Sequence, residues 1–221
     1  MARITLGYWK MRGIAQPIRL LLGYKKVNFV DEIYELGDAP DYDNSCWMDL
    51  KYKCGLCFPN LPYLIDGNVK ITQCNAIMAY LGRKFQMDGE TEKEKIRIDM
   101  IMNQAADLRN AFITLAYRSN VDNFEGKSER YKKKLHTNLG LYNNFLGNDH
   151  TWFAGEKLTI ADFMMYEYFD QHRLFDERLF DSFKRLQEFM QEFEELPEMK
   201  EFLPSEECFK GDIFGKMALI R

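Results

Sequence analysis

A tyrosine and a tryptophan, Tyr8 and Trp9, end the first apolar run of the chain. The run from Arg3 to Trp9 predicts a buried strand, and a segment with helical spacing begins near Gly13. The Tyr8 hydroxyl is therefore expected beside the N-terminus of a helix, where the helix dipole favours an anion. Taken alone, such a pair is more often part of the core than of a catalytic site.

A second candidate is the segment Pro59-Asn60-Leu61-Pro62-Tyr63, which leads into a predicted strand. A trans peptide bond is the usual state before proline. If the Leu61–Pro62 bond is cis instead, the amide and carbonyl of Leu61 turn outward. A peptide-like ligand can then pair with them as an added strand.

Two further features suit carboxylates. At Thr72-Gln73-Cys74-Asn75-Ala76 a predicted strand ends and a helix begins, and free backbone N–H groups at such a junction bind carboxylates. Trp47 and Lys51 are four residues apart and share one face if they lie on a helix. An indole N–H and an ammonium group there suit a second carboxylate, although a solvated lysine explains Lys51 as well.

The elements that must position these residues lie in the first part of the chain, where strand and helix signals alternate. Gly13 to Tyr24 has helical spacing, and Val27 to Glu35 alternates as a strand. Tyr63 to Ile71 predicts a hairpin that turns at Asp66-Gly67-Asn68. With a helix from Gln73 to Arg83, we predict a mixed sheet, because strands joined through a helix are usually parallel and a hairpin is antiparallel.

The rest of the chain reads as long helices. Thr91-Glu92-Lys93-Glu94 is a capping box that starts a helix running to Tyr117, and Thr159-Ile160-Ala161-Asp162 starts another. Residues 128–146 and 182–196 also show a helical period.

The charge changes at the same place as the pattern. Residues 1–85 carry 11 Lys and Arg against 8 Asp and Glu, whereas the remainder carries 19 against 26. We therefore predict two domains: an α/β domain at residues 1–85 and an all-helical domain at residues 91–221.

Composition argues against several classes of protein. A net charge of −4 and a pI near 5.5 argue against nucleic acid as the main partner. No apolar run approaches the roughly 18 residues that a membrane span needs. Because the start of the chain lacks a signal-like stretch and the five cysteines are an odd number, we expect a cytoplasmic protein without a disulfide framework.

Over its whole length the chain resembles the cytosolic glutathione transferases and, in detail, their mu class. The marks in the first part are Leu6-Gly7-Tyr8-Trp9 with Arg12-Gly13, residues 37–43, residues 58–67, and Ile71-Thr72-Gln73 with Asn75-Ala76-Ile77. Later marks are Gly89-Glu90-Thr91-Glu92, Tyr142 with Phe145-Leu146-Gly147, and Trp152-Phe153-Ala154-Gly155 with Asp162-Phe163. The acidic loop at 37–43 indicates the mu class. The resemblance implies a thioredoxin-like domain of order β-α-β-α-β-β-α, followed by a helical domain that contributes the hydrophobic substrate site.

The resemblance also implies an enzyme that conjugates the thiolate of glutathione, its co-substrate, to small hydrophobic electrophiles in detoxification. Tyr8 would be the catalytic residue, whose hydroxyl donates a hydrogen bond to the glutathione sulfur. The glutathione contacts implied with it are Trp9, Trp47, Lys51, Asn60, Leu61, Pro62, Gln73, Cys74 and Asp107 of the partner subunit. The electrophile would contact Trp9, Met11, Ile14, Ile113, Tyr117 and Phe214. A homodimer is implied, with Phe58 as the aromatic anchor inserted into the neighbouring subunit; no prosthetic group, metal, nucleic acid or membrane is expected.

Two glutathione-site positions depart from the family pattern. Cys74 stands where the family usually has serine, and sulfur is a weak hydrogen-bond partner. Asn44 stands where mu enzymes commonly have arginine. We therefore expect weaker, but not abolished, glutathione binding. The tail between Glu201 and Phe214 also looks longer than in the family, which affects the Phe214 assignment.

Two other motifs invite chemistry that the rest of the sequence does not support. Cys54-Gly55-Leu56-Cys57 has the spacing of a redox or zinc pair, but a tetrahedral zinc site needs a second ligand pair and the three histidines are not suitably spaced. Incidental or oxidation-sensitive thiols are the favoured interpretation. Lys132-Lys133-Lys134 is read as a solvated helix face.

Two alternative functions remain for the same scaffold. One is a non-catalytic carrier of hydrophobic ligands, and the other is a crystallin-like structural protein. The presence of Tyr8, Trp9, Trp47, Lys51 and Gln73 favours the enzyme.

Overall fold

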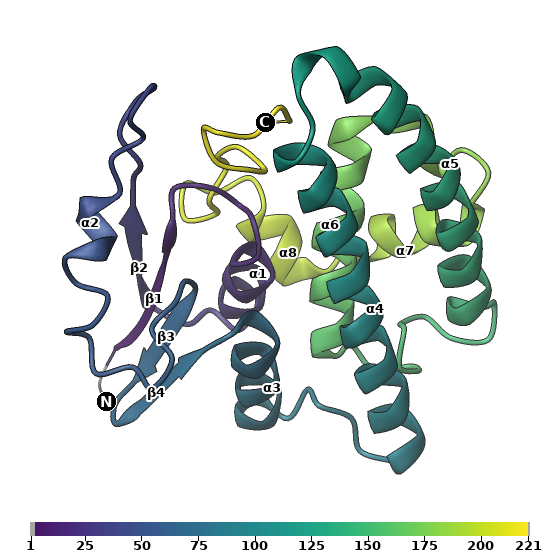
Figure 1. The fold of residues 1–221 in the computed structure, drawn as a ribbon. Helices are drawn as coiled ribbons and strands as arrows, with labels where there is room; N and C mark the ends of the chain where they lie inside the picture. Colours follow the sequence, from purple (N-terminus) through teal and green to yellow (C-terminus); the bar gives the residue numbers. More distant parts are fainter. Residues whose placement is uncertain (1–2, 221) are drawn as a thin grey trace.

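The computed structural model describes residues 3–220, and its first part is built on a four-stranded sheet (Figure 1). The strands are β1 (Ile4–Trp9), β2 (Phe29–Tyr34), β3 (Tyr63–Asp66) and β4 (Val69–Thr72), in the order β2-β1-β3-β4. β1 runs parallel to β2, to which a helix connects it, and antiparallel to β3, which forms the hairpin with β4. The mixed sheet and the predicted hairpin are confirmed.

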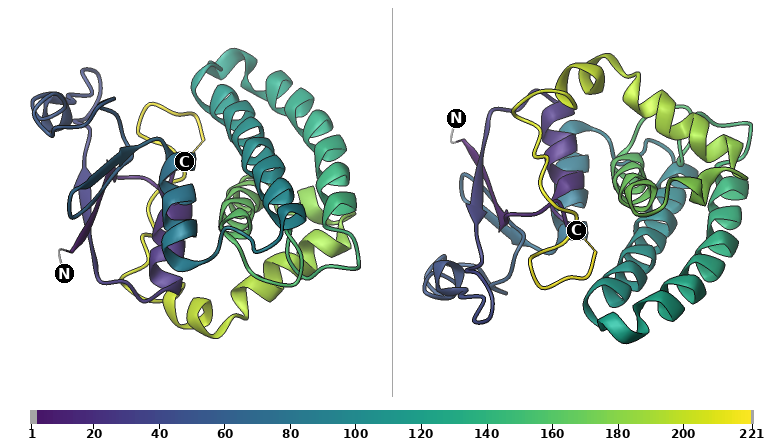
Figure 2. Two further views of the ribbon diagram at one scale, coloured as in Figure 1. Left: turned by 90° about the horizontal axis from the view of Figure 1, so that it is seen from below. Right: turned by 90° about the horizontal axis from the view of Figure 1, so that it is seen from above.

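Three helices accompany the sheet: α1 (Gln16–Tyr24), α2 (Ser45–Met48) and α3 (Cys74–Phe85). α1 and α3 lie between the sheet and the helical part of the molecule, whereas α2 lies on the outer side (Figures 1 and 2). Pro17 stands in the first turn of α1, where a missing N–H costs nothing. Ile18, Leu21 and Ile77 are fully buried, so this face of the sheet is closed by apolar packing.

The second part is entirely helical in the residues described. Its elements are α4 (Glu92–Tyr117), α5 (Val121–Leu146), α6 (Ile160–Phe175), the short 3-10 helix η1 (Glu177–Phe180), α7 (Lys184–Glu194) and α8 (Pro197–Phe202). α6 lies at the centre, and most of its side chains are buried. None of the helices within residues 3–220 is both long and apolar enough to cross a membrane.

The start of α6 is fixed by Asp162, a fully buried carboxylate. Its oxygens accept hydrogen bonds from the amides of Phe153 and Thr159, both at 2.8 Å, and from the Thr159 hydroxyl at 3.0 Å. Burial raises the pKa of Asp162 to about 6. The capping boxes predicted at Thr91 and Thr159 are both present.

The two parts are joined by buried polar contacts as well as by apolar packing. Arg12, in the turn after β1, forms ion pairs with Glu167 at 2.7 Å and Asp170 at 2.6 Å on α6. The side-chain amide of Gln171 donates to the carbonyl of Gly13 at 3.0 Å. Because Glu167 and Gln171 are almost completely buried, these bonds fix the turn between β1 and α1 against α6.

The segment after α8 returns to the junction of the two parts (Figure 2). The Leu219 amide donates to the carbonyl of Ala116 at 2.9 Å, near the end of α4. The Lys216 ammonium donates to the carbonyl of Leu36 at 2.9 Å and pairs with Asp38 at 2.7 Å. This tail therefore connects the end of α4 to the loop after β2.

The structure differs from the predicted elements at several helices. α5 starts at Val121 rather than at 128, because Asn120 and Asn123 cap it reciprocally. α2 is only four residues long, so Lys51 lies beyond its end, although the Lys51 amide still donates to the Trp47 carbonyl at 2.9 Å. η1 and α8 are short helices that no periodic pattern predicted.

Candidate active site

Tyr8 lies in the second-to-last position of β1 and is 4 % exposed. Its hydroxyl oxygen accepts a hydrogen bond from the Ile14 amide at 3.3 Å, in the turn that leads into α1. Burial is the largest influence on the phenol and raises its pKa well above the ordinary value, so the hydroxyl keeps its proton at neutral pH. The expected position of Tyr8 beside a helix N-terminus is confirmed by this contact.

Arg19 supports the same turn from α1. It is 1 % exposed, pairs with Asp31 at 2.8 Å, and donates to the Met11 carbonyl at 2.9 Å. Its guanidinium carbon lies 6.0 Å from the centre of the Tyr8 ring. The tail adds two bonds, since the carbonyls of Asp212 and Ile213 accept from the amides of Arg12 and Gly13 at 2.8 and 2.9 Å.

The Leu61–Pro62 peptide bond is cis, and both residues are buried just before β3. Trp47 is 4 % exposed and stacks on Tyr63, with ring centres 6.0 Å apart. Lys51 is half-buried, with its ammonium 5.6 Å from the centre of the Tyr52 ring, and Asn60 is exposed. Lys51 forms no ion pair with any residue in the range 3–220, so its charge is open to a ligand carboxylate.

Gln73 connects β4 to α3 with a φ of +74°, a left-handed conformation that is rare for residues other than glycine. Its side chain is exposed at the start of α3. Strained backbone conformations of this kind are frequent at binding sites. The residue type of Gln73 does not predict this conformation.

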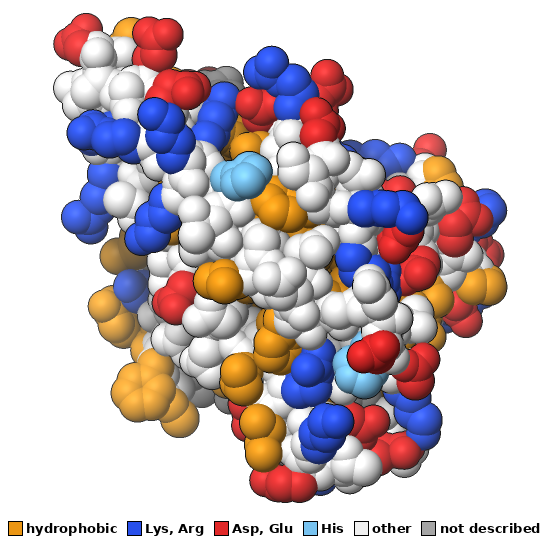
Figure 3. Space-filling view, turned by 90° about the vertical axis from the view of Figure 1, so that its right-hand side faces the viewer, with side chains coloured by type: hydrophobic (Ala, Val, Ile, Leu, Met, Phe, Trp, Pro, Cys, Tyr) orange, Lys and Arg blue, Asp and Glu red, His pale blue; other side chains and the backbone are white. Residues whose placement is uncertain are grey.

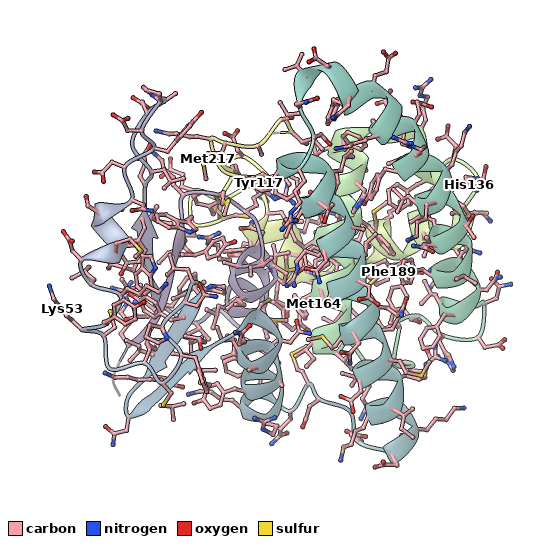
Figure 4. All side chains as sticks on the ribbon, in the orientation of Figure 1. Lys53, Tyr117, His136, Met164, Phe189 and Met217 are labelled. Carbon is pink, nitrogen blue, oxygen red and sulfur yellow. The ribbon has the colours of Figure 1, made fainter. Side chains whose placement is uncertain are left out.

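Cys74 follows as the first residue of α3, but its side chain does not point into solvent. It is 3 % exposed, and its sulfur lies 4.0 Å from the Met164 sulfur on α6, in the centre of the molecule (Figure 4). Burial raises the pKa of the Cys74 thiol to about 12. The thiol is therefore neutral and packs against the helical part of the chain.

A cavity of about 740 Å³ opens next to Trp9, at the junction of the two parts. Four of the six residues predicted for the electrophile line it: Trp9, Met11, Tyr117 and Phe214. Ile14 and Ile113 are outside its lining and pack instead in the neighbouring apolar clusters. The size and largely apolar walls of the cavity suit a small hydrophobic molecule.

Tyr117 contributes a hydroxyl group to the lining of this cavity. Its hydroxyl oxygen accepts from the Gly215 amide at 2.8 Å, and among residues 3–220 its hydrogen has only the Met11 sulfur, at 3.9 Å, as a partner. Burial raises the pKa of Tyr117 above its ordinary value. The hydroxyl is thus a neutral donor with a weak acceptor that a substrate can replace.

Sequence reasoning missed several residues that line the cavity: Tyr34, Leu36, Phe209, Gly215, Lys216 and Met217. Met217 lies close to Tyr117 at the opening between the two parts (Figure 4). Tyr34 lies beside Trp9 in the parallel register of β1 and β2. Its only signal in the sequence was its place near the end of the predicted strand from Val27 to Glu35. The residues of the C-terminal tail could not be predicted from the sequence pattern, because they belong to no helix or strand with a periodic pattern.

The remaining predicted residues lie away from this cavity. Asp107 is exposed on α4, and Phe58 is 77 % exposed in the loop before β3. Cys54 and Cys57 are free thiols. No group of three or more metal-binding side chains lies together within residues 3–220.

Comparison with known proteins agrees with this architecture. Residues 4–83 match the family model described as glutathione S-transferase, N-terminal domain, and residues 106–206 match the model for the C-terminal domain of the same family. The chain belongs to the glutathione S-transferase family.

Its relatives then narrow the class. The chain is 48% identical over 215 residues to glutathione S-transferase Mu 2 of Mus musculus, covering 97% of both proteins. It is 46% identical to glutathione S-transferase Mu 5 of Homo sapiens over the same length and share of each chain. Among solved structures it resembles the glutathione S-transferase Blo t 8, with a TM-score of 0.89 and 36% identity over 98% of this chain and 99% of that one. This chain is a member of the mu class.

Proposed function

We propose that the chain binds glutathione along the groove beside Tyr8 and transfers its sulfur to a small hydrophobic electrophile held in the 740 Å³ cavity. The single observation that carries the proposal is the neutral, buried Tyr8 hydroxyl at the start of the turn before α1, one residue from a wall of that cavity. The enzyme would act in the cytoplasm in detoxification.

The chemistry follows from the pKa of a thiol. A free thiol has a pKa near 8.5, so only a few per cent is thiolate at neutral pH, and the thiolate is the nucleophile. Tyr8 donates a hydrogen bond to the thiolate and so lowers the pKa of the glutathione sulfur. Lowering it by two units requires about 2.7 kcal/mol, which is within reach of one charge-assisted bond near a helix terminus.

Glutathione carries two carboxylates and an amino group, and the groove offers partners for each. Trp47 and Lys51 take the glycyl carboxylate, and the backbone of Leu61, beside Asn60 and Pro62, pairs with the cysteinyl residue. Gln73 and the backbone amide of Cys74 hold the γ-glutamyl end, together with Asp107 of the partner subunit. The positive balance of residues 1–85 favours this anionic tripeptide.

The electrophile lies against Trp9, Met11, Tyr117 and Phe214, with Ile14 and Ile113 behind this wall. In aromatic substitution the carbon–sulfur bond forms first, and the bond to the leaving anion breaks afterwards. The negative charge that develops on the electrophile accepts the hydrogen of the Tyr117 hydroxyl.

Tyr8→Phe tests the proposed role of the phenol. We expect turnover of a chlorinated nitroaromatic with glutathione to fall at least tenfold at pH 6.5, and the pKa in the pH–rate profile to rise toward that of free glutathione. Tyr80→Phe, which removes a hydroxyl bonded to Asp66 instead, is the matched control and keeps the wild-type profile. An unchanged profile in Tyr8→Phe would falsify the role.

The same preparation separates the enzyme from the carrier and structural alternatives. The enzyme is retained on immobilised glutathione and turns over the nitroaromatic compound. If the wild-type chain is retained but shows no turnover, the carrier is indicated. If it shows neither retention nor turnover, the structural protein is indicated.

We also propose that the chain forms a homodimer, with Phe58 as its anchor. Phe58 is 77 % exposed in the loop before β3. The resemblance implies that it enters the neighbouring subunit, and interfaces concentrate their energy on aromatic anchors of this kind. Phe58→Ser should shift the mass measured by light scattering from dimer toward monomer. Tyr52→Ser, another exposed aromatic residue, serves as the control and should leave the mass unchanged.

A further inference from the structure

A second hollow lies on the helical part of the molecule, away from the proposed glutathione groove. It has a volume of about 510 Å³ and is bounded by Lys132, Lys133 and His136 of α5 on one side, and on the other by Asp176, Arg178, Leu179 and Ser182 in and around η1. His136 lies on α5, at the opposite end of the molecule from Lys53 (Figure 4). We call this hollow the α5–η1 pocket.

The pocket has an excess of positive charge. Three permanent cations, Lys132, Lys133 and Arg178, face a single carboxylate, Asp176. Figure 3 shows lysine and arginine side chains over the upper part of this side of the molecule, interspersed with acidic side chains. Residues 86–221 as a whole carry 19 basic against 26 acidic residues, so this local excess runs against the charge of its surroundings.

Asp176 cannot neutralise the three cations. One of its oxygens accepts from the Lys132 ammonium at 2.9 Å, and the other accepts from the Arg178 amide at 3.1 Å and guanidinium at 3.4 Å. Glu129 lies 3.8 Å from Lys132 but outside the lining. Lys133 has no ion pair or hydrogen bond with any residue in the described part of the chain, so its charge is open to a ligand.

The rest of the lining fits a phosphate compound. Lysine, arginine and a serine hydroxyl are donors that phosphate oxygens accept, and charge-assisted bonds of this kind are the strong ones. The hollow is shallow and open to solvent, with room for more than one phosphate group. The His136 ring packs on Phe183, with centres 4.9 Å apart, and Leu179 adds an apolar wall.

From this charge, volume and lining we infer that the α5–η1 pocket binds an oligophosphate group, free or carried by a nucleotide. The phosphates lie against Lys132, Lys133 and Arg178, and a nucleobase, where present, lies against Leu179 and the His136 ring. Because the whole chain has a net charge of −4, a polyanion gains little from non-specific attraction, and binding depends on this local cluster.

Calorimetric titration of the full chain with ATP, inorganic tripolyphosphate and adenosine, without added divalent cations, tests the inference. We expect ATP and tripolyphosphate to bind, with affinity that falls as salt is added, and adenosine not to bind measurably. Tighter binding of ATP than of tripolyphosphate identifies a nucleotide as the source of the phosphates, and equal binding identifies the free oligophosphate. If neither anion binds at millimolar concentration, the inference is wrong.

Charge variants locate the site. Lys133→Glu should weaken ATP binding about tenfold or more, and Arg178→Gln should weaken it by several-fold, because each removes a charge-assisted contact. Lys93→Glu, the same charge reversal at an exposed position in the first turn of α4, is the matched control and should change the affinity less than about twofold. Equal losses in Lys133→Glu and Lys93→Glu contradict a localised site. All three variants should keep wild-type glutathione turnover, so this test is independent of the proposed function.

Discussion

Gly13 and Tyr8 are in such close contact that no side chain fits between them. A Cβ atom on Gly13 would lie 2.5 Å from the Tyr8 hydroxyl oxygen and 2.8 Å from the ring carbon Cε1, and Gly13 has a φ of +46°. The glycine that follows Arg12 is thus required twice, by the turn conformation and by the position of the phenol.

Gly13→Ala should therefore damage both stability and activity. The left-handed conformation costs an L-residue about 1–2 kcal/mol, and overpacking a buried ring adds about 1–3 kcal/mol. We expect a clear fall in the urea midpoint and at least a tenfold loss of glutathione turnover, since the hydroxyl must move. Gly126→Ala is the control, because its Cβ would meet nothing within 4 Å and it is exposed in the second turn of α5. That variant should be neutral or slightly more stable; equal behaviour of the two alanine variants would contradict the steric argument.

The bond between the Gly215 amide and the Tyr117 hydroxyl fastens the tail over the cavity. Tyr117→Phe removes it, and a net bond of about 0.5–1.5 kcal/mol corresponds to roughly a twofold to tenfold faster hydrogen exchange at the Gly215 amide. Tyr142→Phe removes a hydroxyl bonded to the Gln104 carbonyl instead and should leave exchange in the tail unchanged. Exchange at Gly215 that is insensitive to Tyr117→Phe would show that apolar packing alone holds the tail.

The sequence predicted those elements whose signals are local. The capping residues Thr91 and Thr159 mark helix starts through bonds made within one turn, and Asp66-Gly67-Asn68 marks a hairpin within three residues. Tyr8 was placed beside a helix start because strand and helix are adjacent in the chain.

Features that depend on distant contacts were not predictable in this way. The cavity wall from Phe209 to Met217 is built by a tail that returns to α4 and to the loop after β2, and neither contact has a periodic signature. The orientation of Cys74 toward Met164, 90 residues away, is set by the packing of α3 on α6. The resemblance to a family supplied the role of Tyr117 and Phe214, not the shape of the cavity around them.

His172 makes the fold sensitive to acid. It is 1 % exposed and packs on Phe112, with ring centres 4.2 Å apart; its Nε2 lies 2.6 Å from the Tyr131 hydroxyl. Burial lowers the pKa of His172 from 6.5 to about 4. Between these values the unfolded chain binds the proton and the folded chain does not, so stability falls as the pH drops from about 6.5 toward 4.

Because of His172, the free energy of unfolding is about 2 kcal/mol lower at pH 5 than at pH 7. Asp162 acts in the opposite direction, because its pKa of about 6 favours proton uptake by the folded chain. His172→Gln should therefore remove the destabilising contribution and become relatively more stable, against wild type, at pH 5 than at pH 7. Urea unfolding at both pH values measures the difference, and His136→Gln, at an exposed position, is the control. A pH-independent difference between wild type and His172→Gln would contradict the low pKa.

At Cys74 we predict that a substitution can raise the affinity for glutathione. The thiol is buried against Met164. The resemblance to the family implies a serine here, and we expect a serine hydroxyl to donate to the γ-glutamyl carboxylate. Cys74→Ser should lower the KM for glutathione about twofold to tenfold, the equivalent of one hydrogen bond of about 0.5–1.5 kcal/mol, with little change in kcat. The substitution also removes the contact between the thiol and the Met164 sulfur, so the urea midpoint should fall slightly.

Cys208→Ser provides the control for that exchange. Cys208 is also buried, at 6 % exposure, but it contacts Gln16 and lies outside the cavity lining and the groove. It should lose stability without any change in the KM for glutathione. If Cys74→Ser behaves in the same way, the hydroxyl does not reach the tripeptide, and the backbone amide at the start of α3 holds the γ-glutamyl carboxylate without side-chain help.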